Sequence, residues 1–182
     1  MGNWYCEGAD KPYPSLFDNS EAGVKFKMGT SNVCEASYLL RSKGPVNANA
    51  VITITYAIEV IDGTPDFVAM ETNNTPNSGT VGIMLRRSTD TSKEHHRFWY
   101  KAPGTRVNLE PGTYTITAPC NDLVNWSSVY GKSASTVPSS FASLLANLRD
   151  IALTFGGGSF YGHGVRVYGG NIKFTVVSAT VS

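Results

Sequence analysis

The stretch Ile151–Val176, IALTFGGGSFYGHGVRVYGGNIKFTV, decides the fold that the sequence predicts. Its first residues alternate as in a β-strand, three glycines interrupt them at Gly156–Gly158, and the strand pattern resumes beyond Gly164. Seven of the 18 glycines of the chain fall between Gly156 and Gly170, a clustering that is typical of tight turns and bulges. We therefore expect this stretch to supply the last strands of a β-sandwich, around which the rest of the chain packs.

The remaining chain is predicted to form short strands separated by turns. In the clearest of them, Val51–Ile61, apolar side chains occupy one face and threonines much of the other. Further strands are predicted at Val24–Met28, Cys34–Leu40, Asp66–Glu71, Val81–Arg87, His96–Lys101 and Thr113–Thr117. Strands that recur roughly every 10 to 15 residues are typical of a sandwich or jelly roll. The predicted fold class is all-β, a single antiparallel β-sandwich (jelly roll) domain over residues 1–182 with one short helix.

One segment has a helical period instead. Phe141, Leu144, Leu145 and Leu148 stand at i, i+3, i+4 and i+7, and Pro138 lies near the expected first turn. We expect a short helix whose apolar stripe caps one open end of the sandwich. Residues 1–20 are rich in aromatic and turn-forming residues, and we expect an irregular N-terminal arm laid across the body.

The bulk composition excludes several classes of function. Charged residues make up 16% of the 182 residues and the net charge is +1, without a basic stripe, so a nucleic-acid partner is not expected. No apolar run reaches about 18 residues, so no membrane span is expected. The first residues show neither the basic nor the apolar region of a signal peptide.

The three cysteines, Cys6, Cys34 and Cys120, allow at most one internal disulfide, and their spacing contains no CxxC zinc pattern. Two alternatives stay open. Either a Cys6–Cys34 disulfide ties the N-terminus to the body and Cys120 is a buried thiol, or all three cysteines are reduced.

The glycines at Gly156–Gly158 follow a strand, as the glycines of a nucleotide-binding loop do. Such a loop must open a helix, because the helix N-terminus receives the phosphates. Here the following residues are predicted to form a strand, so nucleotide binding is rejected and the glycines are interpreted as hinges of β-turns.

Catalytic patterns are weak. The chain contains neither GxSxG nor SxxK, the signatures of serine nucleophiles. Three carboxylates near the central strands, Glu59, Asp66 and Glu71, leave a glycosidase-like pair open, although acidic residues on strands usually face solvent. His163, between two glycines, is either a ligand-binding residue or a loop histidine bonded to backbone. No metal site is predicted, because further ligands are not found.

The aromatic residues give the best candidate for binding. Trp99 lies opposite the Phe98 and Tyr100 face of its strand, and an indole ring offers a flat apolar surface on which a sugar ring can stack. Arg86 and Arg97 flank Trp99 if their two strands are neighbours. The turn-like run that starts at Trp126 favours core packing for that second indole.

The C-terminal half resembles the galactose-binding-like β-jelly rolls that occur as carbohydrate-binding modules. The resemblance is carried by Trp126-Ser127-Ser128-Val129-Tyr130-Gly131, the helix, and Ile151-x-Leu153-Thr154-Phe155-Gly156-Gly157 with the closing strand. It implies a secreted, extracellular β-sandwich that binds a polysaccharide or oligosaccharide on a concave face or at loop tips. Many such modules also hold a structural calcium, for which this chain shows no acidic loop.

Three hypotheses about function follow. The first is non-catalytic carbohydrate binding through Trp99, Arg97 and Arg86, with Tyr161 and His163 at the glycine-rich loop and no cofactor. The second is a structural or assembly subunit of a capsid, fibre or filament, in which the N-terminal arm supports self-association. The third is a small glycoside hydrolase or polysaccharide lyase.

Overall fold

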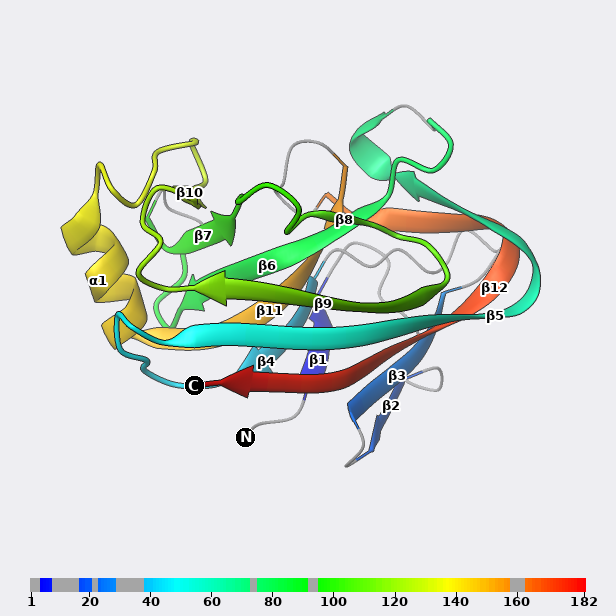
Figure 1. Ribbon diagram of the computed structural model, residues 1–182, viewed down its shortest axis with the longest axis horizontal. Helices are drawn as coiled ribbons and strands as arrows, with labels where there is room; N and C mark the ends of the chain where they lie inside the picture. Colours follow the sequence, from blue (N-terminus) through cyan, green and yellow to red (C-terminus); the bar gives the residue numbers. More distant parts are fainter. Residues whose placement is uncertain are drawn as a thin grey trace.

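The computed structural model of the chain describes residues 4–7, 17–20, 23–28, 38–72, 75–91, 95–157 and 163–182 (Figure 1). Within these residues, two antiparallel sheets form a sandwich, with seven strands in sheet A and five in sheet B. This confirms the predicted all-β antiparallel sandwich with one short helix. None of the helices in these ranges is long and apolar enough to cross a membrane.

Sheet A contains, in spatial order, β1 (Trp4–Glu7), β4 (Tyr38–Ser42), β11 (Leu148–Gly156), β6 (Thr80–Arg87), β7 (Arg97–Tyr100) and β10 (Trp126–Ser128), and β8 (Val107–Asn108) also pairs with β6. Sheet B contains β2 (Phe17–Ser20), β3 (Gly23–Met28), β12 (Val165–Val181), β5 (Val51–Ala69) and β9 (Gly112–Pro119). The helical elements are α1 (Pro138–Ala146) and the 3₁₀ turn η2 (Met70–Thr72).

The glycine-rich stretch supplies a central strand to each sheet. β11 lies between β4 and β6 in sheet A, and β12 lies between β3 and β5 in sheet B. The chain therefore crosses from one sheet to the other between Gly156 and Val165. The prediction that the stretch supplies the last strands of the sandwich is confirmed.

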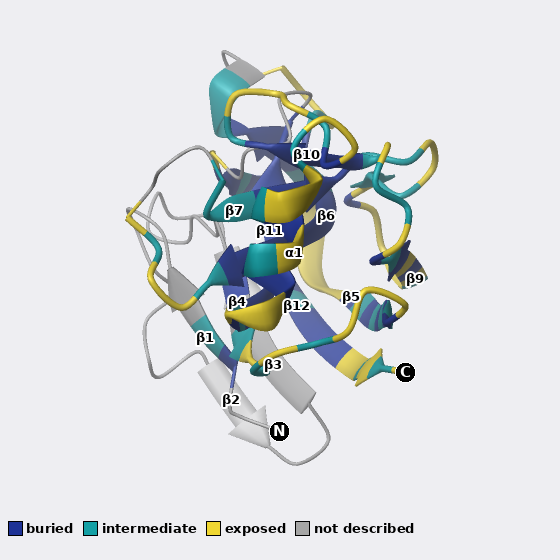
Figure 2. Ribbon diagram, turned by 90° about the vertical axis from the view of Figure 1, so that its left-hand side faces the viewer, coloured by how far each residue is buried: buried dark blue, intermediate teal, exposed yellow. Residues whose placement is uncertain are grey.

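The core lies between the inward faces of the two sheets, which are drawn dark blue in Figure 2. The alternation predicted for Val51–Ile61 is observed as far as Ile58, with Ile52, Ile54 and Tyr56 fully buried, whereas Val60 is exposed. The Tyr56 ring stacks on Phe174 at 5.1 Å between centroids, and Phe174 meets Phe155 of the opposite sheet at 5.3 Å. Burying such rings stabilises the fold by roughly 1.5–3 kcal/mol each.

The longest strands, β5 and β12, pair along most of their length and bend together (Figure 1). At the bend the backbones approach so closely that a side chain would not fit. A Cβ atom on Gly63 would lie 2.7 Å from Gly170 Cα, and one on Gly169 would lie 2.7 Å from Thr64 O. Both glycines also have positive φ values of 70° and 71°. Asp62-Gly63, a dipeptide typical of turns, is therefore a bend within a single strand.

The helix α1 covers one end of the sandwich, at the left of Figure 1, as predicted. Its Phe141, Leu144 and Leu145 side chains are buried. The Phe141 ring packs edge-on against Phe98 at 4.9 Å and contacts the Trp126 ring at 5.6 Å. Leu148, the fourth member of the predicted stripe, belongs to β11 instead.

The structure corrects three predictions of local structure. The described residues of the predicted irregular arm form strands, because Trp4–Glu7 pairs with β4 and Phe17–Ser20 pairs with β3. Short edge strands are hard to predict, since a single neighbour supplies their hydrogen bonds. Of the predicted strand Asp66–Glu71, the residues up to Ala69 are the far end of β5, whereas Met70 and Glu71 belong to η2. Trp126–Ser128, predicted as a turn, is the edge strand β10. The part of the predicted strand Cys34–Leu40 before Tyr38 lies outside the described residues.

Cys120 is a buried free thiol. Burial raises its pKa to about 11. The side chains of Cys6 and Cys34 lie outside the described residues, so both alternatives for them stay predictions.

The bend makes a testable prediction. Gly63→Ala adds a Cβ where Gly169 and Gly170 lie, whereas Gly44 has a similar φ of 83° with nothing within 4 Å of the added Cβ. We expect Gly44→Ala to cost about 1–2 kcal/mol for the left-handed backbone alone and Gly63→Ala about 2 kcal/mol more for overpacking. Urea unfolding of both variants measures the difference. Equal costs would show that the close approach of the two strands is not a constraint.

Candidate functional site

The pairing of β6 with β7 brings three of the predicted site residues together. Met84 lies opposite Trp99, and Arg86 lies opposite Arg97. Phe98 and Tyr100 belong to the core, so Trp99 lies on the opposite, outer face of sheet A. The expected neighbourhood of the two strands is thus confirmed, whereas a binding role of these residues stays a prediction.

The outer face of sheet A is unusual because its side chains are buried. Trp99 is only 2% exposed and packs with Met84 and Ala152, and Tyr5 and Val129 contact this group. The outer face of sheet B, in contrast, carries exposed threonines such as Thr115, whose hydroxyl lies 2.9 Å from that of Thr55. We call Tyr5, Met84, Arg86, Trp99, Asp150 and Ala152 the outer-face cluster.

Asp150 is the polar centre of this cluster and was not predicted. It is fully buried on β11, opposite Arg86, which is 3% exposed. The Arg86 Nε donates to Asp150 Oδ2 over 2.8 Å, and Arg149 Nε donates to the same oxygen over 2.6 Å. The second oxygen, Oδ1, accepts from Tyr5 at 2.8 Å and from the Ser42 hydroxyl at 3.3 Å.

These contacts set the ionisation of the cluster. Burial alone would raise the pKa of Asp150, but the hydrogen bonds from Arg149, Tyr5 and Arg86 and the charge of Arg86 outweigh it, so the pKa lies below its usual value. Burial, together with the hydrogen bond to Asp150, raises the pKa of Tyr5. At neutral pH the cluster therefore holds a carboxylate, a guanidinium and a neutral phenol.

A rim of more accessible side chains borders the cluster. The Arg97 side chain is 21% exposed, and its Nη2 and Nε lie 2.6 Å and 2.8 Å from Asp90 Oδ2. Tyr130, which follows Val129 in the turn after β10, is 72% exposed and is the exposed aromatic residue among the described side chains. Tyr130 was not among the binding residues predicted from the sequence.

The other two predicted site residues are not part of this cluster. Tyr161 lies outside the described residues. His163 is exposed at the opposite end of β11, where Gly164 N donates to Phe155 O over 3.0 Å. The six residue steps from Asp150 to Gly156 span about 20 Å of strand, so His163 is remote from Arg86.

A second polar group lies near His163. Gly157 N donates to Glu71 Oε1 over 2.6 Å, and Thr80 Oγ1 donates to Gly156 O over 2.7 Å. Arg106 donates to Thr80 Oγ1; its burial lowers its pKa to about 10, against the opposing effect of the Glu71 charge. These hydrogen bonds join the end of β11 to its surroundings, including β6. This structural role explains why polar side chains gather there.

The remaining acidic residues do not form a metal site. Glu59 pairs with Lys173 at 2.7 Å, and Asp66 accepts from Asn77 N at 2.6 Å. No group of three or more His, Cys, Asp or Glu side chains within the described residues is arranged to hold a metal ion.

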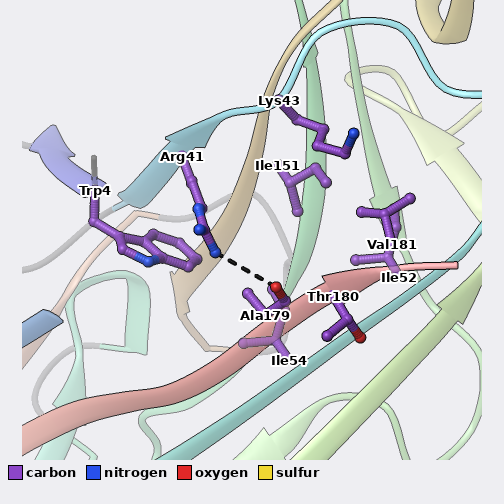
Figure 3. Close-up of a pocket in the computed structure, with 9 residues that line it drawn as sticks. All are labelled: Trp4, Arg41, Lys43, Ile52, Ile54, Ile151, Ala179, Thr180 and Val181. Atoms are coloured by element: carbon purple, nitrogen blue, oxygen red, sulfur yellow. Dashed lines mark hydrogen bonds between the residues drawn. The ribbon is translucent and has the colours of Figure 1, made fainter. Parts of the chain in front are cut away.

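A small pocket opens where the ends of the two sheets meet (Figure 3). It is lined by Trp4, Arg41, Lys43, Ile52, Ile54, Ile151, Ala179, Thr180 and Val181 and encloses about 250 Å³, including its opening to solvent. Arg41 lies over the Trp4 ring at 5.6 Å and donates to Ala179 O over 3.4 Å. Because its walls are mainly hydrocarbon, the pocket lacks the converging polar groups that fix a polar ligand.

No family model matches the chain, and no curated protein matches it. Solved structures do. A "xylan-binding module CBM15" is 16% identical with a TM-score of 0.44, over 98% of this chain and 89% of that chain. The non-crystalline cellulose specific carbohydrate-binding module CBM28 is 11% identical with a TM-score of 0.41, over 98% of this chain and 86% of that chain.

A third structure, described as "Prominent members of the human gut microbiota express endo-acting O-glycanases to initiate mucin breakdown", is 11% identical with a TM-score of 0.46. The match covers 100% of this chain and 92% of that chain. Two of the three are carbohydrate-binding modules, the class that the C-terminal half of this chain resembles. The TM-scores of the three structures lie between 0.41 and 0.46.

The buried ion pair makes a testable prediction. Asp150→Asn keeps the size of the side chain but removes the charge that faces Arg86. Because an uncompensated buried charge is costly, we expect the free energy of unfolding at pH 7 to fall by about 3 kcal/mol. The matched control is Glu59→Gln, which removes a carboxylate from an exposed pair and should cost under about 1 kcal/mol. Urea unfolding measures both.

The cost of Asp150→Asn should depend on pH. Because the folded-state pKa of Asp150 is lowered, its contribution is complete above the unfolded-state value of about 4 and is lost as the pH falls through the folded-state value. The difference in unfolding free energy between the two proteins should therefore shrink below about pH 4. A difference that stays constant from neutral to strongly acidic pH would contradict the assignment.

Proposed function

We propose that this protein binds carbohydrate without catalysing a reaction, through the outer face of sheet A and its rim. The observation that carries the proposal is the pairing of β6 with β7, which sets Arg86, Arg97 and Trp99 side by side on the face turned away from the core. Of these three side chains Arg97 is the accessible one at 21%, since Trp99 is 2% and Arg86 is 3% exposed.

The chemistry of the face suits a neutral glycan. A sugar ring has an apolar C–H face, which packs on an aromatic ring, and hydroxyl groups that both donate and accept hydrogen bonds. Each guanidinium on this face is held by a carboxylate, Arg86 by Asp150 and Arg97 by Asp90. Such pairs offer donors and acceptors together while their charges balance.

Access to the face begins at its rim. Tyr130 at 72% exposure and the Arg97 side chain at 21% offer the first contacts, whereas Trp99 at 2% forms the floor beneath them. A sugar ring is therefore expected to stack on Tyr130 and to accept hydrogen bonds from Arg97. His163, at the far end of β11, has no part in this site as proposed.

The non-catalytic part of the proposal is supported by the acidic residues. Glu59, Asp66 and Glu71 each contact a different partner: Lys173, Asn77 N and Gly157 N, respectively. A hydrolase would instead need two carboxyl groups flanking one bond. We also propose an extracellular location, on the strength of the resemblance to modules of secreted enzymes, and a site that needs no cofactor.

Affinity gels and titration calorimetry with neutral polysaccharides (xylan, glucan, mannan, galactan) and with polygalacturonate test the proposal. We expect Tyr130→Ala and Arg97→Ala each to weaken binding about tenfold or more, since central contacts of this kind usually contribute over 1 kcal/mol. The matched controls are Tyr168→Ala and Lys173→Ala on sheet B, which should leave binding unchanged. Thermal unfolding verifies that each variant is folded.

Three results would contradict the proposal. The first is that no polysaccharide binds, and the second is that the variants and their controls bind alike. The third is release of new reducing ends or of unsaturated products from a bound polysaccharide, which would instead support the hydrolase or lyase alternative.

A further inference from the structure

The hydroxyl of Tyr5 occupies a defined place between two charged groups. It accepts a hydrogen bond from Arg86 Nη2 over 2.7 Å and donates one to Asp150 Oδ1 over 2.8 Å. Both partners are buried, since the side-chain exposure is 4% for Arg86 and 0% for Asp150. One neutral hydroxyl thus bridges a guanidinium and a carboxylate at a site shielded from water.

A sugar hydroxyl bound to such a pair makes the same two hydrogen bonds, since it too has one donor and two acceptor positions. We propose that the Arg86–Asp150 pair is a subsite for a hydroxyl group of a neutral sugar, and that Tyr5 fills this subsite in the present structure. The inference rests on the proposed function and adds to it the class of ligand and an intramolecular competitor.

The ring of Tyr5 also lies where the ring of a bound sugar would lie. It packs against the group formed by Met84, Trp99 and Ala152, and the Arg86 guanidinium lies 6.0 Å from its centre. A flat six-membered ring therefore already lies between a guanidinium and an indole-containing surface, with its hydroxyl bound at one end. This is the place and the orientation that a sugar ring needs to use both groups.

Tyr5 is carried by β1, a strand of four residues whose Trp4 is buried in the core. Among the described strands, β1 ends the order of sheet A and is hydrogen-bonded to β4 alone. Edge strands with few partners open at lower free energy than central strands such as β11. Release of β1 would remove Tyr5 from the subsite while Asp150 keeps Arg86 and Arg149 in place.

The charges around the subsite select a neutral ligand. A sugar carboxylate placed where the Tyr5 hydroxyl lies would stand 2.8 Å from Asp150 Oδ1, with no proton to donate to it, and would be repelled. The Arg86 and Arg149 guanidinium groups are both already paired with Asp150. A neutral polysaccharide is therefore expected to bind more tightly than polygalacturonate, whose every unit carries a carboxylate.

The test compares wild type with Tyr5→Ala and Tyr5→Phe, by calorimetry with the neutral polysaccharides named above and with polygalacturonate. Tyr5→Ala removes the ring and the hydroxyl, and Tyr5→Phe removes only the hydroxyl. The apparent affinity is the intrinsic affinity multiplied by the fraction of molecules whose subsite is free. If Tyr5 fills the subsite in about nine molecules of ten, Tyr5→Ala should bind a neutral polysaccharide about tenfold more tightly. Tyr5→Phe should gain about threefold, and Tyr168→Ala should not change binding.

The outcomes separate this inference from the proposed function. If wild type binds and neither Tyr5 variant binds more tightly, or if polygalacturonate is preferred, the subsite is refuted while carbohydrate binding stands. If none of the proteins binds any polysaccharide, both proposals fail. Should Tyr5→Ala prove unfolded by thermal melting, Tyr5→Phe decides, because it keeps the ring that packs against Trp99.

Discussion

The pairing of β5 with β12 is the constraint on which the rest of the structure depends. These two strands form the middle of sheet B and bend together where Gly63 meets Gly169 and Gly170. A backbone without Cβ atoms allows that approach, since any side chain at Gly63 would overlap the facing strand. The inward residues on either side of the bend, including Tyr56 and Phe174, then meet across the core.

Much of the fold could be predicted because its signals are local. Strict alternation in Val51–Ile61 and the helical spacing of Phe141, Leu144 and Leu145 each reflect one face buried against a neighbour. The segments whose structure was predicted wrongly are strands of three or four residues: Trp4–Glu7, Phe17–Ser20 and Trp126–Ser128. So short a strand shows too few alternations to be recognised, and its existence depends on hydrogen bonds to a partner that is distant in sequence.

The candidate site could be predicted only where the alternation of side chains along one strand was enough to assign a residue to a face. The alternation of side chains along a strand placed Trp99 opposite Phe98. It would equally have placed Asp150 on the same face as Ala152, had the predicted strand begun before Ile151. The contact of Tyr5 with Asp150 joins residues 145 positions apart, which no local pattern encodes. The burial of Trp99 likewise results from packing across strands, and the sequence predicted an accessible ring instead.

The central position of β11 and β12 has a consequence for the order of folding during synthesis. Without β11, the described strands of sheet A separate into a β1–β4 pair and a group around β6 and β7; without β12, sheet B separates into β2–β3 and β5–β9. A ribosome-bound chain that has not yet released residues 148–181 therefore holds four fragments with open apolar faces and unpaired edges. Neither layer can close until these residues emerge, so folding is late and cooperative, and the nascent chain must be protected from aggregation until then.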